Sequence, residues 1–274
     1  MKFLNSAFTL IELLVVIVVI GLLSTISIAS FNGYMEKARL AKAQHFAVSS
    51  QKTLFLEVLR DGVNNFTFRL TYDGNSIDES GEITYIRDIS GQGNDFSPSS
   101  PQWGNKGKDA HPSTDIPLPL GSGYSLDLTD STRGFERRAV DTNNKVVETG
   151  TISTWFKYDS LPSDYKYIFY VYKNGGNSIT LGAKADGVFR FRTGANGGHE
   201  ILSKPGLIKE GVWHHVIAAY DGSKMKLWID GNFIGEKTAN VGNIWGPGTM
   251  VLGGVNFTGK LDNSDFYPVV FEDF

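Results

Sequence analysis

The chain of 274 residues carries a formal net charge of −3, and 41% of its residues are apolar. That is enough apolar sequence for one sizeable core with an appended element. Nucleic-acid binding is not expected, because it needs clustered Lys and Arg and the sequence has no basic stretch. The chain has no Cys, which excludes zinc-finger, iron–sulfur and thiol-nucleophile chemistry but not an extracellular location.

Residues 8–29 form a nearly unbroken apolar run. As a helix rising about 1.5 Å per residue, this run spans about 33 Å, close to the hydrocarbon thickness of a bilayer. It is too long for an ordinary secretory signal, and no clear A-x-A-like cleavage site follows it. We therefore expect a retained transmembrane segment, for which a plain signal anchor is the simplest explanation.

Glu12, inside the apolar run, argues against a plain anchor. A carboxylate near the membrane core costs on the order of 3 kcal/mol, so such a residue is usually paired or functional. The free amine of a neighbouring subunit would be a suitable partner if the mature chain began just before Phe8.

The run AFTLIELLVV at 7–16 resembles the class III signal of type IV prepilins and pseudopilins. The resemblance implies cleavage between Ala7 and Phe8 by a prepilin peptidase, so that residues 1–7 are a leader, and N-methylation of Phe8. It also implies that Glu12 meets the Phe8 amine of an adjacent pilin subunit during assembly. Two features depart from the family pattern: Ala7 stands where Gly is commonest, and the leader carries one charged side chain, Lys2.

Apolar residues recur at spacings of three and four beyond the apolar run, which predicts that the helix continues. Asp61 and Gly62 then provide a stop. The pattern predicts one helix over 8–62, apolar at first and amphipathic later, that packs against copies of itself and against its own head. The apolar sets are Phe31, Met35, Ala38 and Ala41; Leu40, Ala43 and Ala47; and Leu54, Phe55, Val58 and Leu59.

From about residue 66 the pattern changes to short alternating apolar stretches separated by Gly, Asn, Asp and Pro, which is typical of an antiparallel sandwich. The clearest element is a hairpin over 212–229 that turns at 221–223, and a second turn at 230–231 leads into a third strand. The predicted fold class is therefore α+β, a long N-terminal helix followed by an antiparallel β-sandwich.

Several segments of the sandwich resemble a laminin G-like, concanavalin A-type jelly roll. They are GVWHHV at 211–216, YDG at 220–222, LWIDG at 227–231, the early loop DISGQGND at 88–95, TISTWF at 151–156 and the closing FTGKLD at 257–262. The segments occur in the family's order, so the resemblance implies one jelly-roll domain over 66–274.

The sequence offers no recognisable catalytic motif. Glucanases of this superfamily carry paired carboxylates in an E-x-D-x-x-E strand, and no such spacing occurs here. Ser, His and Asp are not set in a known nucleophile motif either. His214 and His215 are adjacent, so in a strand they point to opposite faces and cannot bind one ion together. We expect a binding head and not an enzyme.

The resemblance also implies a calcium ion held between the early loop and the closing strand. Asp88, Asn94 and Asp262 are hard oxygen donors at the matching places. The alternative is turn chemistry, since Asp and Asn beside Gly stabilise loops without metal. Both explanations stay open. Trp228 is a candidate ligand contact, because it shares a strand face with charged residues, Lys224 among them.

These observations favour an adhesive, pilin-like filament subunit whose head binds a glycan or a protein, such as a cell-surface ligand. The subunit would sit in the inner membrane before assembly and then in an extracellular filament. The alternatives are a pseudopilin of a secretion or DNA-uptake machine in a periplasmic pseudopilus, a simple membrane-anchored binding module, and an anchored hydrolase of unrecognised type. Fold alone does not decide, because jelly rolls host lectins, enzymes and inert modules alike.

Overall fold

The structure, a computed structural model, describes residues 9–61, 68–72, 76–77, 83–98, 110–117, 123–129, 134–138, 149–173, 176–194, 198–239, 248–254 and 257–272. Within these ranges a few side chains are not described, those of 24–30 among them. The predicted leader 1–7 and the two residues of the predicted cleavage site, Ala7 and Phe8, lie outside the described residues.

Helix α1 (Leu10–Asp61) is one element of 52 residues, about 78 Å long at about 1.5 Å per residue. It lies within the predicted range 8–62. Thr9 caps its first turn: the Thr9 backbone N–H and hydroxyl both donate to Glu12 Oε2 at 2.8 Å, and the Glu12 N–H donates to Thr9 Oγ1 at 3.3 Å. This reciprocal capping box satisfies helix-end donors that would otherwise lack partners.

Residues 10–29 of the predicted membrane span, which covers 8–29, make up the first part of this helix. Among the residues that the structure describes, no helix is both long enough and apolar enough to cross a membrane.

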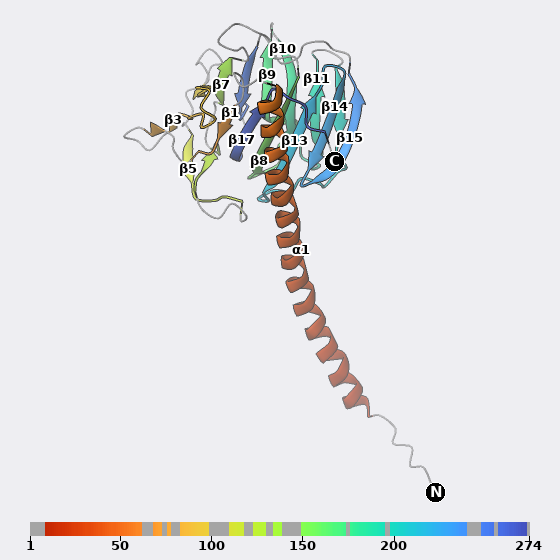
Figure 1. The fold of residues 1–274 in the computed structure, drawn as a ribbon. Helices are drawn as coiled ribbons and strands as arrows, with labels where there is room; N and C mark the ends of the chain where they lie inside the picture. The colour runs from red at the N-terminus through yellow and green to blue at the C-terminus, as the bar shows by residue number, and fades with distance from the viewer. Residues whose placement is uncertain are drawn as a thin grey trace.

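The strands form two large antiparallel sheets, which confirms the predicted sandwich (Figure 1). The eight-stranded sheet has the order β15-β14-β13-β8-β17-β6-β5, with β1 paired to β17. Its strands are β1 (Phe68–Leu70), β5 (His111–Ser113), β6 (Ser125–Asp127), β8 (Gly150–Tyr158), β13 (His214–Tyr220), β14 (Lys224–Ile229), β15 (Asn232–Thr238) and β17 (Gly259–Tyr267).

The seven-stranded sheet has the order β12-β11-β10-β9-β16-β7-β4, and β2 and β3 form a separate pair. The strands of this sheet and of the pair are β2 (Ser76–Ile77), β3 (Ile83–Tyr85), β4 (Ser97–Pro98), β7 (Phe135–Arg138), β9 (Lys166–Lys173), β10 (Gly176–Ala183), β11 (Phe189–Thr193), β12 (His199–Leu202) and β16 (Thr249–Leu252).

The predicted three-stranded unit is confirmed as β13, β14 and β15. Val216 pairs with Ile229 across the first hairpin, and β14 pairs with β15 across the second. The second turn places Asp230 and Gly231 at φ values of 50° and 69°. The left-handed region suits Gly and tolerates Asp, which explains the Asp-Gly sequence at this turn.

The main core lies between the two sheets. Alternate residues of each strand point into it, among them Phe156 and Val216 from the eight-stranded sheet and Phe169, Leu181 and Phe191 from the seven-stranded sheet.

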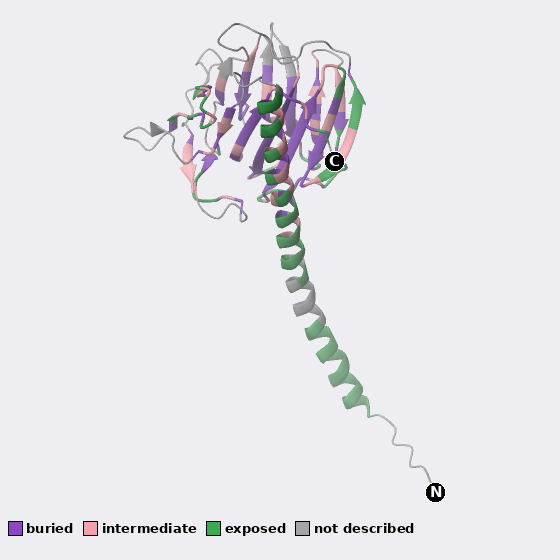
Figure 2. Cartoon of the chain, viewed as in Figure 1, coloured by how far each residue is buried: buried purple, intermediate pink, exposed green. Residues whose placement is uncertain are grey.

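A second packed layer lies between α1 and the outer face of the eight-stranded sheet. Figure 1 shows α1 crossing this sheet, and Figure 2 shows that the described side chains of its lower half are mostly exposed whereas its upper half lies against buried strands. The helix residues that are buried recur at spacings of three and four, as expected for one face of a helix. They are Leu40, Ala43, Ala47, Ser50, Leu54 and Val58.

Only some of the predicted apolar sets of the helix therefore contact the head. Leu40, Ala43 and Ala47 pack against Trp155 and Trp213. By contrast, Phe31 and Met35, from the other predicted row, are exposed, as is Phe55.

Polar contacts at two positions along α1 complete its attachment to the head. At the lower end, Arg39 donates to Asp230 Oδ2 and to the Trp213 carbonyl oxygen, both at 2.6 Å. Higher up, Gln51 Nε2 donates to Asp265 Oδ2 at 2.6 Å. The second half of α1 is thus part of the folded head.

Candidate functional site

The broad face that α1 leaves uncovered is the outer face of the seven-stranded sheet. Phe169, Leu181, Phe189 and Phe191 point into the core between the sheets. Side chains alternate along a strand, so their neighbours Tyr170, Thr180, Arg190 and Arg192 point outward. In the register of the sheet, Thr180 lies between Tyr170 and Arg192.

Tyrosine and arginine side chains gather on this face. The guanidinium carbon of Arg190 lies 3.7 Å from the centroid of the Tyr165 ring, close enough for a cation–π contact. Arg190 Nη2 donates to the Tyr167 hydroxyl at 3.0 Å. The Tyr167 and Tyr170 rings follow with centroids 6.3 Å apart at 60°. We call Tyr165, Tyr167, Tyr170, Thr180 and Arg190 the tyrosine–arginine face.

Two polar atoms of this face are buried without a hydrogen-bond partner among the described residues: Thr180 Oγ1 and Arg190 Nε. A buried donor without a partner costs about 1–3 kcal/mol, so each such group calls for an explanation. Both atoms are shielded from solvent, so a ligand with hydroxyl or carbonyl oxygens would satisfy them only after the neighbouring side chains moved.

A glycine allows the Arg190 and Tyr167 side chains to meet. Gly182 stands opposite both residues in the ladder, beside a register shift between β9 and β10. A Cβ at this position would collide with the Lys166 carbonyl oxygen, so a larger residue does not fit. With no side chain between them, Arg190 and Tyr167 form their hydrogen bond directly.

Two tyrosines of this face, Tyr165 and Tyr170, have a raised pKa and are neutral hydrogen-bonding groups at physiological pH. Burial raises the pKa of Tyr170, and the nearby charge of Glu136 raises it further. Burial also raises the pKa of Tyr165. Flat rings with protonated hydroxyls, next to an arginine, suit a ligand with apolar faces and many hydroxyls, which is the chemistry of a sugar.

The predicted calcium residues are placed in two different elements. Asp88 lies in the early loop, and its carboxylate accepts four hydrogen bonds, from the backbone N–H of Arg69, Ser90 and Asn94 and from the Ser90 hydroxyl, at 2.8 to 3.0 Å. Asp262 lies in β17, and its Oδ1 accepts from the Asn263 N–H at 2.7 Å. These contacts are the turn chemistry of the alternative explanation.

A metal-binding cluster does not occur in the described part of the chain, since no three His, Asp or Glu residues there lie close enough to share an ion. Calcium binding at Asp88, Asn94 and Asp262 stays a prediction.

The two adjacent histidines point to opposite faces of β13, as the alternation predicts. His214 Nδ1 lies 2.8 Å from Asp230 Oδ2, and its ring stacks on Phe156 of the core. His215 faces α1, with Nε2 2.9 Å from Ser153 Oγ, and burial lowers its pKa to about 4. His215 is thus a neutral structural residue.

Trp228 requires a correction, because it is only 1% exposed. It packs edge-on against Phe271, with ring centroids 5.1 Å apart, in a cluster that includes Leu54 and Val58 of α1. The alternation along β14 correctly predicts that Trp228 points away from the core between the sheets. The outer face of the sheet, to which it points, is covered by α1. Trp228 is therefore not an exposed ligand platform.

Glu12 is exposed in the isolated chain, with its carboxylate held by Thr9 as described above. Its proposed partner, the Phe8 amine of another subunit, lies outside the described residues.

The tyrosine–arginine face was not found from the sequence. A signal was present: tyrosines at 165, 167, 170 and 172 recur within one strand-like stretch, YKYIFYVYK. The arginine and threonine that complete the face come from β10 and β11, and only the strand register brings them together.

Comparison with known families now defines the class of protein. The model of the concanavalin A-like lectin/glucanases superfamily matches residues 135–273, slightly more than half of the chain. The chain belongs to this superfamily. A second model, the prokaryotic N-terminal methylation motif, matches residues 3–28. The chain therefore joins a type IV pilin signal to a concanavalin A-like domain, as the sequence predicts. A search of curated proteins finds no match.

Solved structures share the fold at low sequence identity. Domain 4 of AbnA, an extracellular arabinanase from Geobacillus stearothermophilus solved with arabinotriose, is 16% identical with a TM-score of 0.56, over 75% of this chain and 93% of that one. The botulinum neurotoxin serotype D binding domain is 13% identical with a TM-score of 0.53, over 76% of this chain and 49% of that one. A Trypanosoma rangeli sialidase is 12% identical with a TM-score of 0.52, over 75% of this chain and 30% of the sialidase chain.

Proposed function

We propose that this protein is a type IV pilin-like filament subunit whose head binds a glycan, without catalysis, through the tyrosine–arginine face. The observation that carries the proposal is the arrangement of the chain. The element with the methylation motif covers one face of the sandwich, and the opposite face presents aromatic rings beside two buried polar atoms that have no hydrogen-bond partner among the described residues. The bound arabinotriose of the AbnA domain supports a sugar as the ligand class for this fold.

The methylation motif supports a proposed localisation. Residues 8–29 would anchor the precursor in the inner membrane, and a prepilin peptidase would cut between Ala7 and Phe8. The methylated Phe8 amine would then pair with Glu12 of an adjacent subunit, since a carboxylate at that depth needs a partner. The assembled subunit would carry its head outside the inner membrane.

The N-terminal half of the proposal is tested by the mass of the N-terminal peptide from the native host. A peptide that begins at methylated Phe8 is expected. A peptide that begins at Met1 would leave a membrane-anchored binding module instead. Recovery of the processed protein in sheared surface filaments would separate a pilus from a periplasmic pseudopilus.

Glycan binding by the head is tested by measuring the affinity of the full chain, in detergent, for a panel of polysaccharides that includes arabinan. Aromatic stacking contributes a large share of sugar affinity, so Tyr170→Ala and Arg190→Ala should each weaken binding at least tenfold. Phe233→Ala is the matched control, because Phe233 is an exposed aromatic residue of β15 in the other sheet.

Binding that survives both substitutions would place the glycan elsewhere on the head. No binding to any glycan would reject the proposed ligand class. Product formation on the panel would revive the hydrolase alternative.

A further inference from the structure

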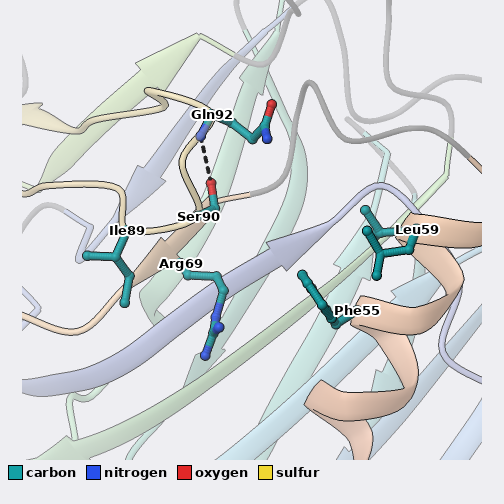
Figure 3. Close-up of a pocket in the computed structure, with 7 residues that line it drawn as sticks. Phe55, Leu59, Arg69, Ile89, Ser90 and Gln92 are labelled. Atoms are coloured by element: carbon teal, nitrogen blue, oxygen red, sulfur yellow. Dashed lines mark hydrogen bonds between the residues drawn. The ribbon is translucent and has the colours of Figure 1, made fainter.

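A pocket of about 370 Å³ lies between the last turns of α1 and the early loop of the head. Its volume falls within the range of small-molecule sites. Phe55, Val58 and Leu59 line it from the helix; Ile89, Ser90 and Gln92 line it from the loop, and Arg69 of β1 completes it. Figure 3 shows the helix residues on one side, the loop residues on the other, and Arg69 between them. The tyrosine–arginine face belongs to the other sheet.

The walls of this pocket are apolar and reach solvent. Phe55, Leu59 and Ile89 are each about half exposed, at 48%, 52% and 50%. Large apolar side chains that surround a concave surface are typical of a ligand site, because a ligand would remove their surface from water.

Arg69 brings a positive charge into the pocket, and among the described residues it is paired only at long range, with Asp265. Its Nε is buried without a hydrogen-bond partner among the described residues. The nearest carboxylate oxygen, Asp265 Oδ1, lies 3.9 Å from it, too far for a hydrogen bond. Asp265 instead accepts from Gln51 and Tyr267. Asp88, the other carboxylate near this site, uses both its oxygens on loop and β1 hydrogen bonds.

The pocket is held in shape from both sides. On the helix side, Val58 is 1% exposed and is fixed in the cluster with Tyr267. On the loop side, the Asp88 carboxylate ties the loop to β1 through the Arg69 and Ser90 N–H groups. A site formed before binding loses little entropy when a ligand arrives.

We propose that this pocket binds a small organic carboxylate that carries an apolar ring. The carboxylate would pair with the Arg69 guanidinium, whose terminal N–H groups suit two-point contact, and the ring would lie between Phe55, Leu59 and Ile89. The site is independent of the proposed glycan face, since the two share no residue.

The test measures binding of 4-fluorobenzoate to the full chain in detergent by ¹⁹F NMR titration, with neutral 4-fluorobenzamide as the paired probe. We expect saturable binding of the benzoate, at least tenfold weaker binding of the benzamide, and at least tenfold weaker benzoate binding to Arg69→Gln. Arg60→Gln is the matched control: Arg60 is an exposed arginine near the same end of α1, so it changes net charge equally.

Arg69→Lys keeps the charge but removes the planar guanidinium, so it should retain part of the affinity. Intrinsic tryptophan fluorescence checks that each variant is folded, since Trp155, Trp213 and Trp228 are buried beneath α1. The proposal is overturned by equal affinity for benzoate and benzamide, by benzoate binding that Arg69→Gln leaves unchanged, or by no saturable binding to the folded chain.

Discussion

Replacing Asp265 by Asn should stabilise the protein at neutral pH. Asp265 lies in β17 beneath α1 and is 1% exposed. Burial raises its pKa to about 6, because the charged carboxylate has lost its hydration, and Arg69 and two hydrogen-bond donors offset only part of that loss. Asn has almost the same shape and keeps an oxygen that accepts from Gln51, but it never carries the charge.

The magnitude follows from the two pKa values. The ordinary aspartate pKa is 3.8 and the pKa in the folded chain is about 6, and this difference corresponds to about 3 kcal/mol of folding free energy. A pKa raised by folding stabilises the folded chain only while the group holds its proton. Stability from this residue is therefore present below about pH 4 and is lost as the pH rises through 6. The Asn variant should gain up to about 3 kcal/mol over the parent at pH 7.5 and almost nothing at pH 4.

The assay is urea unfolding of both proteins in the same detergent between pH 4 and 7.5, followed by tryptophan fluorescence. Taking the difference between variant and parent at each pH removes the titration of every other carboxylate. If the difference in unfolding free energy between variant and parent does not change with pH, Asp265 titrates normally. A variant that is less stable than the parent at pH 7.5 would refute the reasoning.

Three further predictions concern α1. Leu54→Ala should lower the free energy of unfolding by about 2–5 kcal/mol in urea titrations, because Leu54 is fully buried against the sheet, whereas Leu56→Ala, half exposed nearby, should cost about 0.5 kcal/mol or less. Arg39→Ala leaves the buried Asp230 carboxylate without its guanidinium partner and should cost roughly 3 kcal/mol, measured by the same titration; a neutral effect would mean that His214 alone suffices. Glu12→Ala should insert and be processed normally but be depleted from sheared filaments, and normal incorporation would remove the intermolecular pairing argument.

Local patterns predicted much of the fold. The helix and the β13–β14–β15 unit depend on neighbours in sequence: a spacing of three and four residues, alternation, and Asp-Gly turns. The sequence did not show which row of the helix meets the head. Phe31 and Leu40 belong to two equally regular rows, yet only Leu40 is buried, since that choice depends on the outer face of a distant sheet.

The same limit explains the errors at the sites. Trp228 was correctly assigned to the outer face of its strand, but whether an outer face meets water depends on what lies over it. The tyrosine–arginine face depends on the register between β9, β10 and β11, which places Thr180 between Tyr170 and Arg192. Register across three strands depends on which face of each strand is buried and on the geometry of both connecting turns, so no single stretch of sequence encodes it.

The long helix also has a mechanical consequence. From Leu10 to Arg39, the first helix residue with a described contact to the head, α1 extends about 44 Å without a break. If the chain is assembled as proposed, a pull on the helix while a ligand holds the head would run along the helix axis. The row from Leu40 to Val58 lies along that axis, so the head could come away only if all these contacts slid together. Contacts that are loaded together in shear share the force, so they withstand a larger force than contacts that are peeled apart one at a time.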